Sequence, residues 1–215
     1  MKITILTSDV GHPVYAHLVR WQQETRAAHV VELVTTVDAL AGGDILFLIS
    51  CHHIVRASDR ARYRAALVVH ASDVPRGRGW SPLAWQIVEG KNEIVVSLLE
   101  ASDKVDRGDI WARETLHFEG HELVDEIHAA LFAAELRLMD FTVKNLDRVT
   151  PRPQGEAEAS YYRRRTPADS RLDPDKSIAE QFDLLRVADP VRFPAFVDLR
   201  GHRYIVRIEK AGQDR

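Results

Sequence analysis

The sequence contains a single cysteine, Cys51, and no apolar stretch long enough to cross a membrane. One cysteine excludes an internal disulfide framework and is typical of proteins from reducing compartments. The first residues include one lysine and a short apolar run but no small-residue cleavage site, so neither secretion nor membrane insertion is indicated. We therefore expect a cytoplasmic protein with no membrane partner.

An excess of positive charge is also absent. The 215 residues carry 29 Lys and Arg against 32 Asp and Glu, and the formal net charge is -3 at pH 7. Because a nucleic-acid-binding surface needs a positive field to neutralise phosphates, we expect no nucleic-acid partner. The hydrophobic content of 45% is enough for one full core and a small appendage. A homodimer is left open as the oligomeric state.

Short apolar runs alternate with helical patterns along the first two thirds of the chain. Strands are expected at Lys2–Leu6, His29–Val34, Ile45–Ser50, Leu67–Val69, Ile94–Leu99 and near Ile110–Leu116. Helices are expected to start at Pro13 and Pro82, where proline sits in a first turn, and a long helix is expected over Glu122–Leu146. This alternation predicts an α/β fold, a Rossmann-like and mostly parallel sheet with flanking helices on both faces.

The composition changes after the long helix. Pro151, Pro153 and Gly155 are typical of a connector, which divides the chain into a catalytic domain, 1–150, and a small C-terminal module, 151–215. In the module, a helix is expected from Asp175 or Ser177 to Arg186. A hairpin should follow, with Phe193–Val197 and Tyr204–Ile208 joined at Arg200-Gly201. We expect this helix and hairpin to close over the site.

Polar residues follow the fourth expected strand, which ends at His70. Open α/β sheets bind ligands at the carboxyl ends of their strands, so this loop is the first candidate for a site. It contains Arg76-Gly77-Arg78-Gly79, whose glycines would let the backbone pass close to a ligand or to another strand. The run lacks the third glycine of a dinucleotide fingerprint. Ser81 is expected to cap the helix that begins at Pro82, and Gly90 to end it.

Two segments resemble the folate-dependent formyltransferase family. The first is His70-Ala71-Ser72-Asp73-Val74-Pro75, followed by Arg78-Gly79, Pro82 and Trp85; the second is Asp106-Arg107-Gly108-Asp109-Ile110, which resembles the aspartate loop of the family. The resemblance implies transfer of a formyl group from N10-formyltetrahydrofolate to an amine, with His70 and Asp106 as catalytic residues. Metal-ligand types also occur at Cys51-His52-His53 and at His117 and His121. Neither group has zinc-site spacing, and we expect no metal.

The proposed chemistry sets two requirements. The amine must lose a proton as it attacks the formyl carbon, and the carbonyl oxygen becomes an oxyanion that needs donors. His70 can serve as the base or stabilise the oxyanion, with Asp106 strengthening its hold on a proton. The family has an asparagine two residues before the histidine, whereas this chain has Val68. Either His52 or His53 is expected to supply the missing donor, and at most one of them should face the site.

The resemblance also implies ligand-binding positions. The expected folate-binding residues are Ser72, Arg78, Gly79, Asp103 and Val105, and the expected substrate-binding residues are His12, Trp80, Tyr161, Tyr162, Arg163 and Arg165. Tyrosine rings and guanidinium groups could hold the base and diphosphate of a nucleotide, although such a basic stretch is equally compatible with a solvated surface.

Several details resemble the sugar N-formyltransferases, among them Gly77-Arg78-Gly79-Trp80-Ser81-Pro82 and the segment from Ser177 to Arg186. They imply a nucleotide-linked acceptor, a UDP-linked 4-amino-4,6-dideoxy sugar of a pseudaminic-acid-type pathway in bacterial surface-glycan biosynthesis. The chain is shorter than the transfer-RNA formyltransferases and carries no positive field, which disfavours an RNA acceptor. Two alternatives stay open, a formyltetrahydrofolate hydrolase and a non-catalytic protein that binds folate or a sugar nucleotide.

Overall fold

The computed structural model describes residues 1–155 and 158–211. Its centre is a six-stranded sheet with the order β2-β1-β3-β4-β6-β7. The strands are β1 (Lys2–Leu6), β2 (Val30–Val34), β3 (Gly43–Leu48), β4 (Tyr63–His70), β6 (Glu93–Glu100) and β7 (Ile110–His117). Strands β1 to β4 pair in parallel, whereas β6 is antiparallel to both β4 and β7. The predicted mostly parallel α/β sheet is confirmed.

The reversal of β6 follows from the short connection that precedes it. Helix α3 (Pro82–Val88) has seven residues, which advance the chain by about 10 Å. The eight-residue β4 spans about 26 Å. Helix α3 therefore does not carry the chain back along the sheet, and β6 begins at the edge where β4 ends. The sequence predicted a mostly parallel sheet without indicating which strand reverses, because apolar periodicity carries no information on strand direction.

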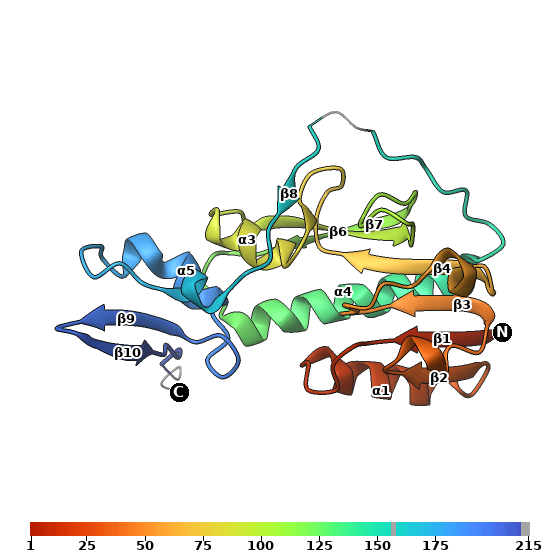
Figure 1. Cartoon of the computed structure of the whole chain (residues 1–215), viewed down its shortest axis with the longest axis horizontal. Coiled ribbons are helices and arrows are strands. Elements are labelled where there is room, and N and C mark those ends of the chain that lie inside the picture. The colour runs from red at the N-terminus through yellow and green to blue at the C-terminus, as the bar shows by residue number, and fades with distance from the viewer. Residues whose placement is uncertain (156–157, 212–215) are drawn as a thin grey trace.

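One face of the sheet is covered by two long helices, α1 (Val14–Thr25) and α4 (Val124–Asn145), as Figure 1 shows. A single buried cluster joins Ile5, Phe47 and Leu67 of the sheet with Leu18 and Trp21 of α1 and Phe132 and Leu138 of α4. The Trp21 indole also donates a hydrogen bond to Asp140 (2.8 Å), which ties the two helices together.

The opposite face is covered more thinly than expected. Its buried cluster consists of Leu6, Leu40, Leu46, Leu48, Val55 and Tyr63. Within the described residues, the helices over this face are only the 3₁₀ turn η1 (Val37–Ala39) and the four-residue α2 (Ala57–Arg60). Val68 and Ala101 pack against the same cluster. The loop that follows β6 therefore folds onto this face, where a full helix would have blocked it.

The C-terminal third is interwoven with the sheet domain. Its elements are β8 (Tyr161–Tyr162), η2 (Pro167–Ser170), η3 (Ala179–Gln181), α5 (Phe182–Val187), β9 (Ala195–Leu199) and β10 (His202–Val206). Strand β8 pairs in parallel with β5 (Arg78–Gly79), and Arg152 pairs with Ile110 at the edge of β7. The segment read as a plain connector thus contributes backbone pairing at two places. The division at residue 150 stays a prediction.

The hairpin turns at Arg200 and Gly201, which both have left-handed backbone, φ 51° and 81°. Its strands lie close to their predicted positions. The expected helix from Ser177 starts instead as a 3₁₀ turn, and its α-helical part begins only at Phe182. Strand β4 is longer than predicted, since Tyr63 to Ala66 also pair with β3. No helix among the described residues is long and apolar enough to cross a membrane.

Candidate active site

His70 and Asp106 meet at the carboxyl end of β4. The Nδ1 atom of His70 lies 3.5 Å from Oδ1 of Asp106, and both side chains are only 7% exposed. The Nε2 atom of His70 lies 2.8 Å from the Gly77 carbonyl oxygen. Because a carbonyl oxygen only accepts, Nε2 carries the hydrogen of this bond. The structure thus brings together the two residues expected to be catalytic, in a buried pair whose orientation the Gly77 carbonyl fixes.

Asp106 is held on a tight loop between β6 and β7. Its backbone is left-handed, with φ 54°, and Gly108 follows two residues later. A Cβ atom on Gly108 would lie 1.7 Å from the Glu100 carbonyl oxygen, so this position accepts no side chain. The Asp-x-Gly pattern therefore has a steric cause, and the loop it forms turns the Asp106 carboxylate back toward His70.

Gln154 fastens this loop to the rest of the protein. Its Nε2 donates to the carbonyl oxygens of Asp106 (2.9 Å) and Gly108 (2.7 Å). Its Oε1 accepts from Nη2 (2.7 Å) and Nε (3.2 Å) of Arg78. Sequence analysis missed Gln154, because a lone glutamine in a proline-rich segment carries no periodic or spacing signal.

The backbone of Gly79 supplies the second contact to Asp106. Its N–H donates to Oδ2 of Asp106 at 2.9 Å. A Cβ atom at Gly79 would lie 2.4 Å from the Tyr162 carbonyl oxygen, and φ is 99°. Of the two readings of this glycine, close approach to another strand is therefore the one the structure shows. The predicted folate contact of Gly79 stays a prediction.

Arg78 is fully buried. Besides Gln154, its guanidinium contacts the Tyr161 hydroxyl at 3.3 Å. Because it is buried and bonded to Gln154 and Tyr161, the Arg78 side chain ties the segment after α4 to the loop after β4. A folate contact through its guanidinium would therefore require the site to open. By contrast, the other predicted folate residues of the Asp106 loop are accessible, since Val105 is 67% exposed and Asp103 forms a surface ion pair with Arg60.

Ser72 lies two residues beyond His70 and is 1% exposed. Its carbonyl accepts a hydrogen bond from the Ser97 hydroxyl (2.7 Å), but its own Oγ has no hydrogen-bond partner among the described residues. A buried hydroxyl without a partner is unfavourable unless a ligand or water satisfies it. Ser72 therefore fits its predicted role in binding the formyl donor.

His52 and His53 point in different directions, as expected for neighbours in an extended segment. Nε2 of His53 lies 3.1 Å from the Thr35 carbonyl oxygen, on the loop after β2. The His52 ring lies beside the Trp80 indole, with ring centroids 5.4 Å apart. Of the two, His52 is therefore the better candidate for the missing donor. Val68 itself packs among apolar side chains and offers no donor.

The rings of Trp80 and Trp85 contact other aromatic rings and guanidinium groups. Trp80 is 40% exposed and has the Arg164 guanidinium 5.0 Å from its ring centroid. Trp85 stacks on Tyr162, with centroids 6.2 Å apart. The Tyr162 hydroxyl is bound to Glu89 (2.7 Å). Trp80 thus presents an open ring near the site, whereas Tyr162 is engaged within the protein.

The basic stretch is only partly available to a ligand. Arg163 forms an ion pair with Asp169, and Arg165 donates to the Asp169 carbonyl oxygen (3.2 Å). Burial lowers the pKa of Arg165 from its ordinary value. Tyr161 is 55% exposed, and its hydroxyl accepts from Arg107 at 2.8 Å. Tyr161 is therefore an accessible ring among the predicted nucleotide contacts, and Arg164 of the same basic stretch lies over the Trp80 ring.

His12 follows β1 and lies in a group of charged and aromatic side chains. Burial, and next the positive charge of Arg192, lower the pKa of His12 to about 4, so its imidazole is neutral at pH 7. Its ring contacts Phe132 edge-on, with centroids 6.0 Å apart, and its Nδ1 accepts from the Val14 N–H (3.2 Å). A neutral imidazole at this edge suits a polar substrate group, as predicted from the resemblance.

Backbone strain also gathers around this edge. Besides Asp106, Ser50 and Ser81 have left-handed backbone, with φ 47° and 49°. Ser50 follows β3, and Ser81 precedes α3. Ser81 occupies the N-cap position of α3 with Pro82 in the first turn, as predicted, but its backbone is left-handed and its side chain makes no capping hydrogen bond. Strained non-glycine residues are often concentrated at functional sites, which supports this edge as the site.

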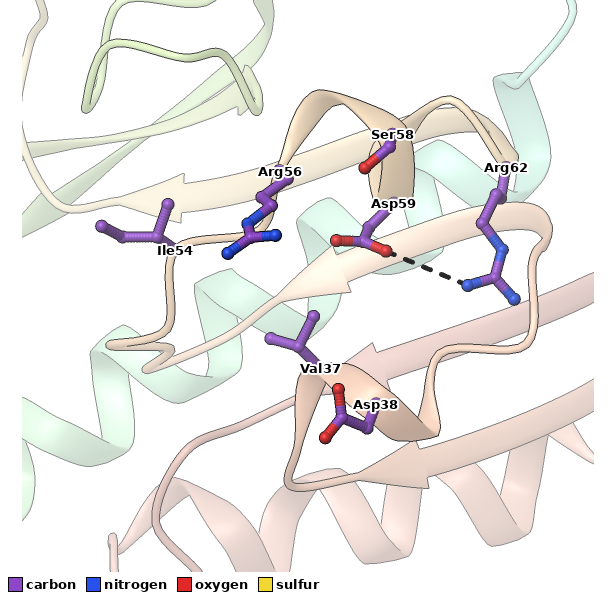
Figure 2. A pocket seen from close by; sticks show the side chains of 7 residues that line it. All are labelled: Val37, Asp38, Ile54, Arg56, Ser58, Asp59 and Arg62. Carbon is purple, nitrogen blue, oxygen red and sulfur yellow. Dashed lines mark ion pairs between the residues drawn. The ribbon is translucent and has the colours of Figure 1, made fainter.

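A separate hollow of about 510 Å³ lies over η1 and α2 (Figure 2). Its lining includes Asp38, Arg56, Asp59 and Arg62, of which Asp59 and Arg62 pair at 4.0 Å. Two acidic and two basic side chains cancel, so the hollow has no strong field for an ion. Within residues 1–155 and 158–211, no three His, Cys, Asp or Glu side chains group as metal ligands do.

Comparison with known proteins shows which sequences this chain resembles. No protein-family model matches the sequence. A methionyl-tRNA formyltransferase from Rickettsia typhi is 31% identical over 164 residues, which are 75% of this chain and 50% of that protein. The chain thus spans about half the length of the curated relatives it matches.

Several solved structures superpose on nearly the whole chain. A methionyl-tRNA formyltransferase from Clostridium thermocellum superposes with a TM-score of 0.83 at 22% identity, covering 100% of this chain and 95% of that one. A sugar N-formyltransferase from Shewanella sp. gives 0.74 at 12% identity, covering 98% of both chains. HypX from Aquifex aeolicus in complex with tetrahydrofolic acid gives 0.77 at 21% identity, covering 97% of this chain and 37% of that one. The chain has the fold of these formyltransferases, and 75% of its length is similar in sequence to half of a methionyl-tRNA formyltransferase.

Proposed function

We propose that this protein transfers a formyl group from N10-formyltetrahydrofolate to the amine of a nucleotide-linked sugar. The observation that carries the proposal is the buried contact between His70 and Asp106, 3.5 Å apart at the end of β4. A histidine beside a carboxylate is the pair needed to accept a proton from an attacking amine. The formyl donor, when bound, supplies the carbon that the amine attacks.

In this proposal each side chain of the site has a separate role. Asp106 orients His70 through Nδ1 and is itself held by the Gly79 N–H. His70 stabilises the oxyanion through its Nε2–H, or takes the proton of the amine at Nε2 in the tautomer whose hydrogen lies on Nδ1 toward Asp106. Either role requires Nε2 to leave the Gly77 carbonyl, since that atom is now engaged. Ser72 and the exposed loop around Val105 are the groups that would hold the folate. His52 is the proposed oxyanion donor in place of the absent asparagine.

The acceptor we propose is a UDP-linked 4-amino-4,6-dideoxy sugar, as in pseudaminic-acid-type biosynthesis of bacterial surface glycans. Support comes from the motifs around Trp80 and from its partly exposed ring, which contacts the His52 ring and the Arg164 guanidinium. Aromatic faces and guanidinium groups suit a nucleotide and its phosphates. Tyr161 is a further accessible ring, 55% exposed.

Methionyl-tRNA is the competing acceptor, because the curated relatives are methionyl-tRNA formyltransferases. Against it stands the charge of this chain, 29 basic against 32 acidic residues, since RNA binding relies on neutralising phosphates. Hydrolysis of the formyl donor would use the same His70 and Asp106, with water in place of the amine. The third alternative is a protein that binds its ligands without turnover, because Val68 stands where the family has an oxyanion donor.

The test is a mass-spectrometric screen in which purified protein and N10-formyltetrahydrofolate are mixed with UDP-linked 4-amino sugars or with methionyl-tRNA. We expect a sugar product heavier by one formyl group and no formylated tRNA. Formate release at equal rates with and without amine would favour the hydrolase. Formylated tRNA alone would replace the sugar as acceptor, and ligand binding without any product would reject catalysis.

Gln154 should act as a positioning residue for Asp106. In Gln154→Glu the bond to Arg78 is kept, but the donors to the Asp106 and Gly108 carbonyls are lost. We expect kcat to fall by at least about tenfold, because the Asp106 loop is no longer fastened. The lost hydrogen bonds contribute roughly 1 kcal/mol each, so the urea unfolding midpoint should fall as well. Gln154→Ala removes the hydrogen bonds to the loop carbonyls and those from Arg78, and should also lower the free energy of unfolding. If Gln154→Glu lost stability but kept kcat, its role would be structural only.

A further inference from the structure

A second hollow, of about 670 Å³, lies between the C-terminal half of α4, the start of β7 and the segment that follows α4. Figure 1 shows this segment leaving the end of α4 and passing over the molecule toward β8. The residues that matter here are Trp111, Arg113, Phe141, Asn145, Arg148 and Arg152. Neither His70 nor Asp106 lines it. It is therefore separate from the candidate active site.

The lining carries positive charge that is balanced only in part. Arg113, Arg148 and Arg152 contribute guanidinium groups, and no Asp or Glu is among the lining residues that the structure describes. Arg113 is held by the Val74 carbonyl (2.7 Å) and by Asp73 (3.1 Å). The side chains of Arg148 and Arg152 have no hydrogen-bond or ion-pair partner within residues 1–155 and 158–211. Two such guanidinium groups suit the oxygens of a phosphoryl group.

The backbone fixes where these two arginines stand. Arg152 exchanges two hydrogen bonds with Ile110 at the edge of β7, at 2.8 and 2.9 Å. The N–H of Arg148 donates to the Asn145 carbonyl (2.8 Å), which continues the end of α4. The guanidinium groups therefore project from anchored positions, so a ligand would not have to order a loose segment before binding.

The remaining wall is apolar and aromatic. Phe141 is 36% exposed and presents its ring at the hollow. The Trp111 ring is partly buried against the core, and its indole N–H is bound to Glu100 (3.1 Å). A volume of this size lies within the range of small-ligand sites. The combination of an exposed ring with two free cations points to a ligand that has both a flat ring and a phosphate.

We propose that this hollow binds a mononucleotide, with its phosphate on Arg148 and Arg152 and its base against Phe141. The site goes beyond formyl transfer, and its occupancy can be measured without turnover. A free nucleotide and the nucleotide part of a sugar nucleotide share this chemistry. Kinetics distinguish the two sources: replacing Arg148 and Arg152 by Gln should raise the KM of the sugar nucleotide if the acceptor occupies the hollow, and leave that KM unchanged if a free nucleotide does.

The experiment is calorimetric titration of UMP, and separately of inorganic phosphate, into the intact protein and its variants. We expect UMP to bind the protein, and to bind the double variant Arg148→Gln, Arg152→Gln at least about tenfold more weakly, given the strength of charge-assisted hydrogen bonds. Lys144→Gln is the matched control, because it removes one charge from the last turn of α4, close in sequence to Arg148, at a residue outside the lining. It should bind UMP like the unmodified protein.

Hydrogen exchange gives a second readout, with slower exchange of the amides of Arg148, Val149, Thr150 and Arg152 expected in the presence of UMP. Unchanged UMP affinity in the double variant, with its circular dichroism intact, would overturn the proposal. So would an equal loss in Lys144→Gln, since binding would then follow overall charge. If inorganic phosphate bound as tightly as UMP, the ring would not be recognised and the nucleotide assignment would be wrong.

Discussion

His70→Ala is expected to lower kcat/KM for formyl transfer by roughly 10²–10⁴, the usual contribution of a positioned acid or base. The reason is that His70 holds the only imidazole in contact with Asp106 among the described residues, at 3.5 Å. Steady-state kinetics with a saturating formyl donor measure the effect. The fold should persist, because the ring lies at the end of β4 and outside the main buried clusters.

Asp106→Asn should give a loss of similar size, since the amide keeps the shape of the side chain but removes its charge. Because the two residues act as a unit, the double variant should be little worse than either single one. His202→Ala, at an exposed histidine of β10, is the matched control and should leave kcat/KM unchanged. Near-normal turnover in His70→Ala, or strictly multiplicative losses in the double variant, would contradict the paired role.

Glu135→Gln is expected to change the pH dependence of stability. Glu135 is 6% exposed on α4, and its Oε2 has no hydrogen-bond partner among the described residues. Burial raises the pKa of this carboxyl from 4.5 to about 8. The folded state thus binds the proton more tightly than the unfolded state. Its stabilising contribution is fully present below pH 4.5 and is lost as the pH rises toward 8.

The glutamine variant does not titrate. The difference in free energy of unfolding between the variant and the unmodified protein should therefore shift by about 3 kcal/mol in favour of the variant between pH 4 and pH 7. Urea denaturation across this pH range measures the gap, and Glu119→Gln, at an exposed carboxylate, is the control. Parallel stability curves for Glu135→Gln and the unmodified protein would show that Glu135 does not titrate as its burial implies.

Much of the fold and the centre of the site follow from sequence. Apolar runs located all six strands of the sheet, although β2 and β7 at its two edges are only partly buried. The Asp-x-Gly pattern marked the Asp106 loop, where a Cβ at Gly108 would meet the Glu100 carbonyl. The strand-end position of His70 indicated where it would lie, since ligands gather at that edge of such sheets.

Other features depend on contacts between distant segments and leave no local trace. Gln154 and Arg78 are 76 residues apart, yet together they hold the Asp106 loop. Only the folded chain shows that β8 lies against Gly79, or that the Tyr162 hydroxyl is bound to Glu89 rather than open to a nucleotide. The direction of β6 depends on the length of one short connection.

The central claim is that the protein moves the formyl carbon to an amine and not to water. Its most direct test uses N10-formyltetrahydrofolate labelled with ¹³C in the formyl group, together with a UDP-linked 4-amino sugar. We predict a ¹³C-labelled formamide on the sugar with the unmodified protein and almost none with His70→Ala. Appearance of the label in formate alone, or unchanged labelling of the sugar by His70→Ala, would contradict the account.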